Sequence, residues 1–157
     1  MKVTMSPHGL KELQRALTKM CKDKKKRVQR EAYDSGLKVQ KKAKDNLKKS
    51  GAWDLGGAGL SGSIECDRVD GGSATEIGPT APHGPFIEYG TRPHFPPYKG
   101  RDAEGLEGWA KRHGFDSVWP ICLVIAERGT PERPFLLPAY MAVVDRYFKN
   151  LKEIVRN

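Results

Sequence analysis

The chain has 157 residues, enough for one domain with a substantial core, and its composition of 38% apolar and 30% charged residues is ordinary for a soluble protein. No apolar run approaches the ~20 residues of a membrane span, and the N-terminus lacks the apolar stretch of a secretory signal. The chain has three cysteines, an odd number, and they lie far apart and match no zinc motif: Cys21, Cys66 and Cys122. Reduced thiols in a cytosolic setting are therefore expected, not a disulfide framework.

The net charge of +9 is concentrated in the N-terminal third. Residues 1–50 hold 16 Lys and Arg against 5 Asp and Glu, a net of +11, whereas residues 51–157 carry a net of −2. A solvated, lysine-rich helix face is the ordinary explanation. The alternative is an electrostatic patch for nucleic acid or an acidic partner protein. The residues of this candidate basic patch are Lys22, Lys24, Lys25, Lys26, Arg27 and Arg30.

Apolar residues at helical spacing predict one long helix, or two collinear helices, over residues 7–48. The stripe begins at Leu10, passes through the lysine-rich stretch and reaches Leu47. Ser6-Pro7 suits a helix start, and Ser50-Gly51 suits a helix end. Because one face is apolar and the other basic, such a helix is expected to lie across a sheet or against another subunit.

The next segments predict a loop and a small sheet. Residues 51–62 are glycine-rich and predict a flexible loop, because no Lys-Ser/Thr pair follows that would suit a phosphate-binding loop. Residues 63–69 and 74–78 alternate apolar and polar side chains around a turn sequence, which predicts a β-hairpin. The proline-bracketed stretch 86–91 is predicted to add a third strand or a strand-like edge, so that the sheet region covers residues 63–92.

Residues 93–132 are expected to form an insertion with helical content. Asp102 is a candidate cap for a short helix that ends at Gly114. Residues 117–128 fit either a helix or a buried strand, and the helix is favoured. Residues 134–156 then predict a C-terminal helix. The predicted fold class is α+β: a single domain, 1–157, in which a long N-terminal helix and a C-terminal helix pack on a small antiparallel sheet.

No pattern of catalytic or ligand-binding residues stands out. The four histidines match no metal-ligand spacing, although His83 and His94 could meet in space. Glu65, Glu76 and Glu88 would act as paired carboxylates only if neighbouring strands aligned them. We therefore expect no enzyme and no catalytic, cofactor-binding or metal-binding residues.

Two short segments mix residue types that seldom occur together, and they predict specific connection points. The first runs from Pro85 to Arg92 and places a carboxylate between two aromatic residues. The second, residues 133–139, sets apolar bulk between prolines. The residues of this candidate assembly interface are Phe86, Glu88, Tyr89, Gly90, Thr91, Arg92, Arg133, Pro134 and Phe135.

Each segment leaves two interpretations open. Glu88 is either an outward charge on an edge strand, or a buried or interfacial carboxylate that accepts hydrogen bonds from a neighbouring subunit. Gly90 is expected to allow a sharp turn or a positive φ. Phe135 is either the core residue at a proline-limited helix entry, or part of an interface in which Arg92 and Arg133 pair with acidic groups of a neighbour.

Four segments, in chain order, resemble a known family. Phe86-Ile87-Glu88-Tyr89-Gly90-Thr91 resembles the aromatic/aliphatic-Glu-aromatic-Gly-Thr signature of the bacteriophage tail-component family, also called tail-completion or head–tail joining proteins. Residues 133–139 are similar to the Arg-Pro-Phe-Leu-x-Pro-Ala element that opens the family's C-terminal helix. Residues 60–64 and Lys41-Lys42-Ala43-Lys44 are similar to its step into the first strand and to the end of its N-terminal helix. The insertion at 93–132 departs from many members and is similar to one in related virion-morphogenesis proteins.

The resemblance implies a non-enzymatic structural protein of a phage or prophage, which completes the tail and joins it to the head as a ring subunit of the neck. Its implied partners are the tail tube, tail terminator and head-completion or stopper proteins. It would act in the virion after assembly in the bacterial cytoplasm, away from membranes, and could be monomeric in isolation. The basic helix would face DNA in the lumen or an acidic partner. The alternative is a nonspecific nucleic-acid-binding protein or small nuclease that uses the same helix.

Overall fold

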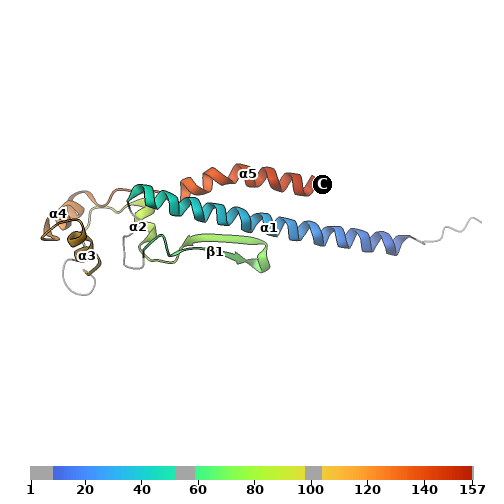
Figure 1. Cartoon of the computed structure of the whole chain (residues 1–157), viewed down its shortest axis with the longest axis horizontal. Coiled ribbons are helices and arrows are strands. Elements are labelled where there is room, and N and C mark those ends of the chain that lie inside the picture. The colour runs from blue at the N-terminus through green and yellow to red at the C-terminus, as the bar shows by residue number, and fades with distance from the viewer. Residues whose placement is uncertain (1–8, 52–58, 98–103, 157) are drawn as a thin grey trace, which may run out of the picture.

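The computed structural model describes residues 9–51, 59–97 and 104–156, and within them the protein has an α+β fold. A single long helix, α1 (Leu10–Ser50), runs along the molecule (Figure 1). A two-stranded antiparallel sheet, β1 (Ile64–Val69) and β2 (Ala74–Pro79), lies on one side of α1, and helix α5 (Leu136–Arg156) lies on the other. No helix of the described part is both long enough and apolar enough to cross a membrane.

Helix α1 is continuous through the lysine-rich stretch, so the first of the two sequence predictions is confirmed. It ends where Gly51 turns into the left-handed region at φ 70°, and the Gly51 N–H donates to the carbonyls of Leu47 and Lys48. The helix thus ends at Ser50, two residues beyond the predicted end. The predicted start at Ser6-Pro7 lies outside the described residues.

The predicted hairpin is confirmed, with Ile64 paired to Pro79 and Val69 to Ala74. It packs closely on α1 at Gly36, where an added Cβ would lie 2.6 Å from Thr75 Cγ2. A short 3-10 turn, η1 (Asp70–Gly72), joins the strands.

The predicted third strand is wrong, because residues 84–89 form a short helix, α2 (Gly84–Tyr89). Pro85 suits the first turn of a helix, since it has no N–H to leave unpaired there. The N–H groups of Phe86 and Ile87 both donate to the His83 carbonyl. The sheet region therefore covers residues 64–79 of the predicted 63–92.

Helix α5 runs antiparallel to α1, and polar contacts mark both ends of their shared interface. Near the start of α5, Asn46 Nδ2 donates to the Phe135 carbonyl at 3.0 Å. At the far end, Lys24 Nζ donates to the Val155 carbonyl at 2.9 Å. The predicted C-terminal helix is confirmed, although it begins at Leu136, two residues later than expected.

The main hydrophobic core lies where the C-terminal half of α1, the hairpin, α2 and the start of α5 meet. Its buried members are Val39, Ala43, Leu47, Leu60, Ile64, Phe135, Ala139 and Val143. Phe135 is the largest fully buried side chain, and burial of such a ring stabilises the fold by about 1.5–3 kcal/mol. The expectation that Phe135 is a core residue at the helix entry is confirmed.

The insertion contains helices α3 (Glu104–Arg112) and α4 (Trp119–Arg128), which confirms the helical interpretation of residues 117–128. Helix α3 is followed by Gly114 at φ 77°, as predicted, whereas Asp102 lies outside the described residues. The insertion is closed at its base by an isolated antiparallel bridge between Thr91 and Thr130.

Candidate assembly surface

Glu88 joins the two segments that the sequence singled out. Its carboxylate accepts three backbone hydrogen bonds from the first turn of α5. Phe135 N–H donates to Oε2 at 2.7 Å, Leu136 N–H to Oε2 at 2.9 Å and Leu137 N–H to Oε1 at 2.9 Å. The side chain is 6% exposed. Glu88 is therefore a capping residue supplied by another helix, 47 positions earlier in the chain.

The electrostatics of this arrangement are favourable. The first N–H groups of a helix have no partner within the helix, and they carry the positive end of its dipole. A carboxylate satisfies both needs, and the bonds are short, as charge-assisted bonds are. Of the two interpretations of Glu88, the edge-strand charge is wrong. The carboxylate accepts hydrogen bonds from backbone groups of its own chain.

A second set of contacts ties the same segments together. Arg133 N–H donates to the Ile87 carbonyl at 2.8 Å. Thr91 N–H donates to the Thr130 carbonyl at 3.1 Å, and the two threonine hydroxyls are 3.0 Å apart. Gly90 and Gly129 precede these threonines at φ 68° and 75°, and an added Cβ on either would lie within 2.5 Å of a carbonyl oxygen across the bridge. The expected positive φ at Gly90 is confirmed, and its reason is this close backbone approach.

The nine predicted interface residues divide into an inward and an outward group. Glu88 and Phe135 are buried, and Gly90 and Thr91 are half-buried within the bridge. The residues whose side chains reach solvent around this joint are Phe86, Tyr89, Arg92, Arg133 and Pro134. Phe86 and Tyr89 are 58% and 74% exposed, which is high for aromatic residues. Arg133 reaches the Ser50 carbonyl at 3.5 Å. These five side chains form the part of the predicted interface that is open to a partner.

The basic residues occupy a helix that projects from the body. Because α5 ends beside Lys24, residues 10–23 of α1, which we call the arm, extend past it (Figure 1). Residues 10–30 hold nine Lys and Arg against Glu12 and Asp23. Five of the nine recur every three or four residues and so share one face: Lys11, Arg15, Lys19, Lys22 and Lys26.

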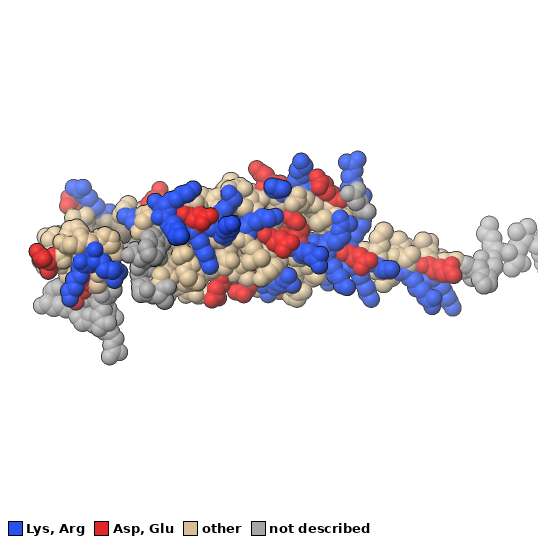
Figure 2. Space-filling view, viewed as in Figure 1, with Lys and Arg blue, Asp and Glu red and all other residues tan. Residues whose placement is uncertain are grey.

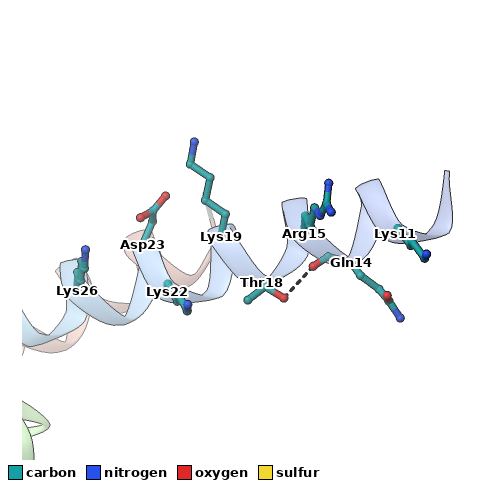
Figure 3. A pocket seen from close by; sticks show the side chains of 8 residues that line it. All are labelled: Lys11, Gln14, Arg15, Thr18, Lys19, Lys22, Asp23 and Lys26. Carbon is teal, nitrogen blue, oxygen red and sulfur yellow. Dashed lines mark hydrogen bonds between the residues drawn. The ribbon is translucent and has the colours of Figure 1, made fainter.

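This face is a convex surface with a shallow groove. The residues lining it all belong to one helix, and the Thr18 hydroxyl bonds back to the Gln14 carbonyl at 2.8 Å (Figure 3). Of the predicted patch, Lys22 and Lys26 belong to this face, whereas Lys24 is bound to the Val155 carbonyl. The contiguous cluster 24–27 is spread around the helix. The periodic spacing from Lys11 to Lys26 was the signal that would have defined the face from the sequence.

No metal-ligating cluster is visible in the described ranges: no three His, Cys, Asp or Glu side chains converge there. Cys122 is buried and Cys21 is exposed, and Cys66, in strand β1, is half-buried where the hairpin packs on α1 at Gly36. Burial, and secondarily the neighbouring Asp67 carboxylate, raise the pKa of the Cys66 thiol.

Comparison with known proteins returned no match: no family model, no curated protein and no solved structure is significantly similar to this chain.

Proposed function

We propose that this protein is a structural component of a phage or prophage virion, which completes the tail and joins it to the head as a ring subunit of the neck. The observation that carries the proposal is the joint between α2 and α5. The two most distinctive segments of the family resemblance are the two partners in this joint: Glu88 of one caps the helix opened by the other. Because each of these two segments needs the other to fold, we expect them to occur together in one chain.

The surface around the joint suits assembly. Phe86 and Tyr89 are exposed beside Arg92 and Arg133, and aromatic and arginine residues are enriched at the energetic centres of protein interfaces. Phe86 and Tyr89 lie on the short helix α2, which is held by the Arg133 N–H on the Ile87 carbonyl, by the Glu88 carboxylate and by the bridge at Thr91. Side chains held rigidly in this way lose less entropy on binding. We assign contacts with other neck and tail proteins to this surface.

The test is deletion of the gene from the phage or prophage genome that carries it, followed by electron microscopy of the lysate. The expected result is DNA-filled heads and finished tails that remain unjoined, with joining restored by the wild-type gene in trans. Complementation by Tyr89→Ala/Arg92→Glu should fail. Exposed Arg112 lies away from the joint, so Arg112→Glu is the matched control and should complement. Normal, infectious virions from the deletion would refute the proposal, as would a genome without capsid and tail-tube genes beside this one.

A second candidate, a nonspecific nucleic-acid-binding protein or small nuclease, is favoured by one observation. The basic face of the arm is a row of lysine and arginine side chains on one side of a projecting helix (Figure 3). Such a row neutralises backbone phosphates without reading bases. This candidate predicts tight binding by the isolated monomer, with an affinity that falls steeply as salt rises.

Fluorescence anisotropy with duplex DNA at two salt concentrations separates the two functions. The neck function predicts weak binding by the isolated chain. If binding is tight, Lys19→Glu/Lys22→Glu should abolish it, and Lys41→Glu/Lys42→Glu, which keeps the same charge change on the body of α1, should retain most of it. Tight binding that responds in this way, together with normal virions from the deletion, would favour the second candidate.

A further inference from the structure

The arm presents a narrow apolar stripe on the side opposite its basic face. The stripe consists of Leu10, Leu13, Leu17 and Met20, at intervals of three, four and three residues. We call it the arm seam. Its members are 57%, 56%, 47% and 47% exposed. It continues the face of α1 that α5 covers, and the end of that cover is marked by the bond from Lys24 to the Val155 carbonyl. In Figure 2 the projecting part shows uncharged surface along its upper side and charged side chains, mostly blue with some red, below.

Helix α5 carries a second such stripe, on a face turned away from α1. The stripe consists of Leu137, Met141, Val144, Phe148, Leu151 and Val155, at alternating intervals of four and three residues. We call it the outer seam. Leu137, Met141, Phe148 and Val155 are more than half exposed, and Val144 and Leu151 are half-buried. An unbroken apolar run of this length on a helix surface is uncommon in a protein that stays alone.

Both seams have the spacing of a coiled coil. Apolar residues spaced alternately three and four apart form a stripe along one side of a helix. In a coiled coil a second helix packs on this stripe, and its side chains insert between those of the first helix. The two seams of one copy are held apart, because the arm begins where α5 ends. Each seam therefore needs a helix from another molecule.

We propose that the chain associates head to tail with a second copy of itself, the arm seam of one copy lying on the outer seam of α5 in the next. This deepens the proposed function, since it names a surface through which ring subunits would join. The arm seam rises about 15 Å and the outer seam about 27 Å at 1.5 Å per residue, so the outer seam can receive the whole arm seam.

Charge does not oppose this contact. In a coiled coil the residues flanking the seam decide whether two helices attract or repel. The arm seam is flanked by Gln14, Ala16, Cys21 and Asp23, while the row from Lys11 to Lys26 lies on the far side of the helix. The flank of the outer seam includes Lys152. Asp23 and Arg27 lie beside the end of the arm seam, and Asp145 and Lys152 lie beside the outer seam, so each flank offers charges of both signs and the basic face stays in solvent.

Head-to-tail pairing is favoured over pairing of like seams because each copy carries one of each kind. Two arms, or two α5 helices, would satisfy one seam and leave the other exposed on every subunit. Pairing of unlike seams leaves one of each kind open at the ends of a chain of subunits, and a closed ring covers them all.

The test uses two variants whose changed residues are exposed, so that folding is retained. Leu13→Glu/Leu17→Glu disables the arm seam, and Met141→Glu/Phe148→Glu disables the outer seam. By sedimentation velocity, wild type is expected to form oligomers and each variant alone to be monomeric. An equimolar mixture of the two variants should form a heterodimer and nothing larger, because one intact arm meets one intact α5. Thr18→Glu and Ala142→Glu, on the same helices away from the seams, should behave as wild type, and circular dichroism checks that all remain helical.

Other outcomes would overturn the proposal. If the arm variant still dimerises, α5 pairs with α5; if the α5 variant still dimerises, arm pairs with arm. A mixture that stays monomeric, or wild type that is monomeric at about 1 mM, the weak end of specific affinity, removes the contact altogether. If the arm variant forms the same oligomers as wild type but no longer binds anionic vesicles that wild type binds, the arm is a membrane-surface helix instead.

The two proposals fail separately. A monomeric wild type overturns the seam contact, while the gene deletion can still show that the protein joins heads to tails through other surfaces. Heterodimer formation with normal virions from the deletion upholds the seam contact and refutes the neck function.

Discussion

Replacing Glu88 tests the joint between α2 and α5 directly. Three backbone N–H groups converge on its carboxylate at 2.7–2.9 Å. Hydrogen bonds to a charged group contribute about 1.5–3 kcal/mol each, and the cost of burying the carboxylate offsets part of their sum. Glu88→Ala also leaves the N–H of buried Phe135 without a partner, at about 1–3 kcal/mol. We expect Glu88→Ala to lower the free energy of unfolding by about 3–4 kcal/mol.

Glu88→Gln separates charge from shape. The amide keeps one carbonyl oxygen but sets an NH₂ donor against a backbone N–H, and it removes the charge that faces the positive end of the α5 dipole. The expected loss is about 2 kcal/mol, between wild type and Ala. Urea unfolding followed by far-UV circular dichroism measures both variants. Exposed Glu132→Gln makes the same chemical change beside the joint and should stay within about 0.5 kcal/mol of wild type.

An ordinary helix cap contributes about 1 kcal/mol. A loss below that value in Glu88→Ala would refute the reasoning, because the carboxylate would then do no more than an exposed serine does. Equal losses in Glu88→Gln and Glu132→Gln would likewise show that the buried charge does not hold α5.

Three further predictions concern the same body. Gly90→Ala should lower the free energy of unfolding in urea by about 3 kcal/mol or more, because at φ 68° its Cβ would lie 2.5 Å from a backbone oxygen. Gly114→Ala, at φ 77° with open space around its Cβ, should lower it by about 1–2 kcal/mol. Equal losses in the two variants would contradict the close approach at Gly90. Gly36→Ala should lower stability by about 1–2 kcal/mol despite the better helix propensity of Ala, since the hairpin side chains 2.6 and 2.9 Å from its Cβ must shift, and a stabilised variant would show that the hairpin yields freely. Burial raises the pKa of the Cys66 thiol, so the pH midpoint of its labelling by iodoacetamide, followed by mass spectrometry, should lie above the ordinary thiol pKa of about 8.5. The free energy of unfolding should be constant below about pH 8.5 and should fall as the pH rises through the raised pKa of the folded protein. A labelling midpoint at or below about 8.5 would contradict the burial.

Local patterns predicted most of the secondary structure. The helical spacing from Leu10 to Leu47 predicted one long helix or two collinear helices, and Gly51 marked the end, because capping and periodicity act within a few residues. The hairpin followed from alternation and a turn sequence in the same way. A strand was predicted over residues 86–91, but residues 84–89 are helical, since a segment of about six residues carries too little periodicity to separate the two forms.

The sequence by itself determined the α+β class, the concentration of positive charge in α1 and the importance of the segments around Glu88 and Arg133. Only the tertiary structure decided that Glu88 faces inward, since its partners lie 47 to 49 positions away and no local rule reaches that far. It also decided which part of α1 is left uncovered: α5 ends beside Lys24, so the apolar stripe from Leu10 to Met20 extends beyond the body. Burial depends on where another element ends, and that is a property of the packed chain.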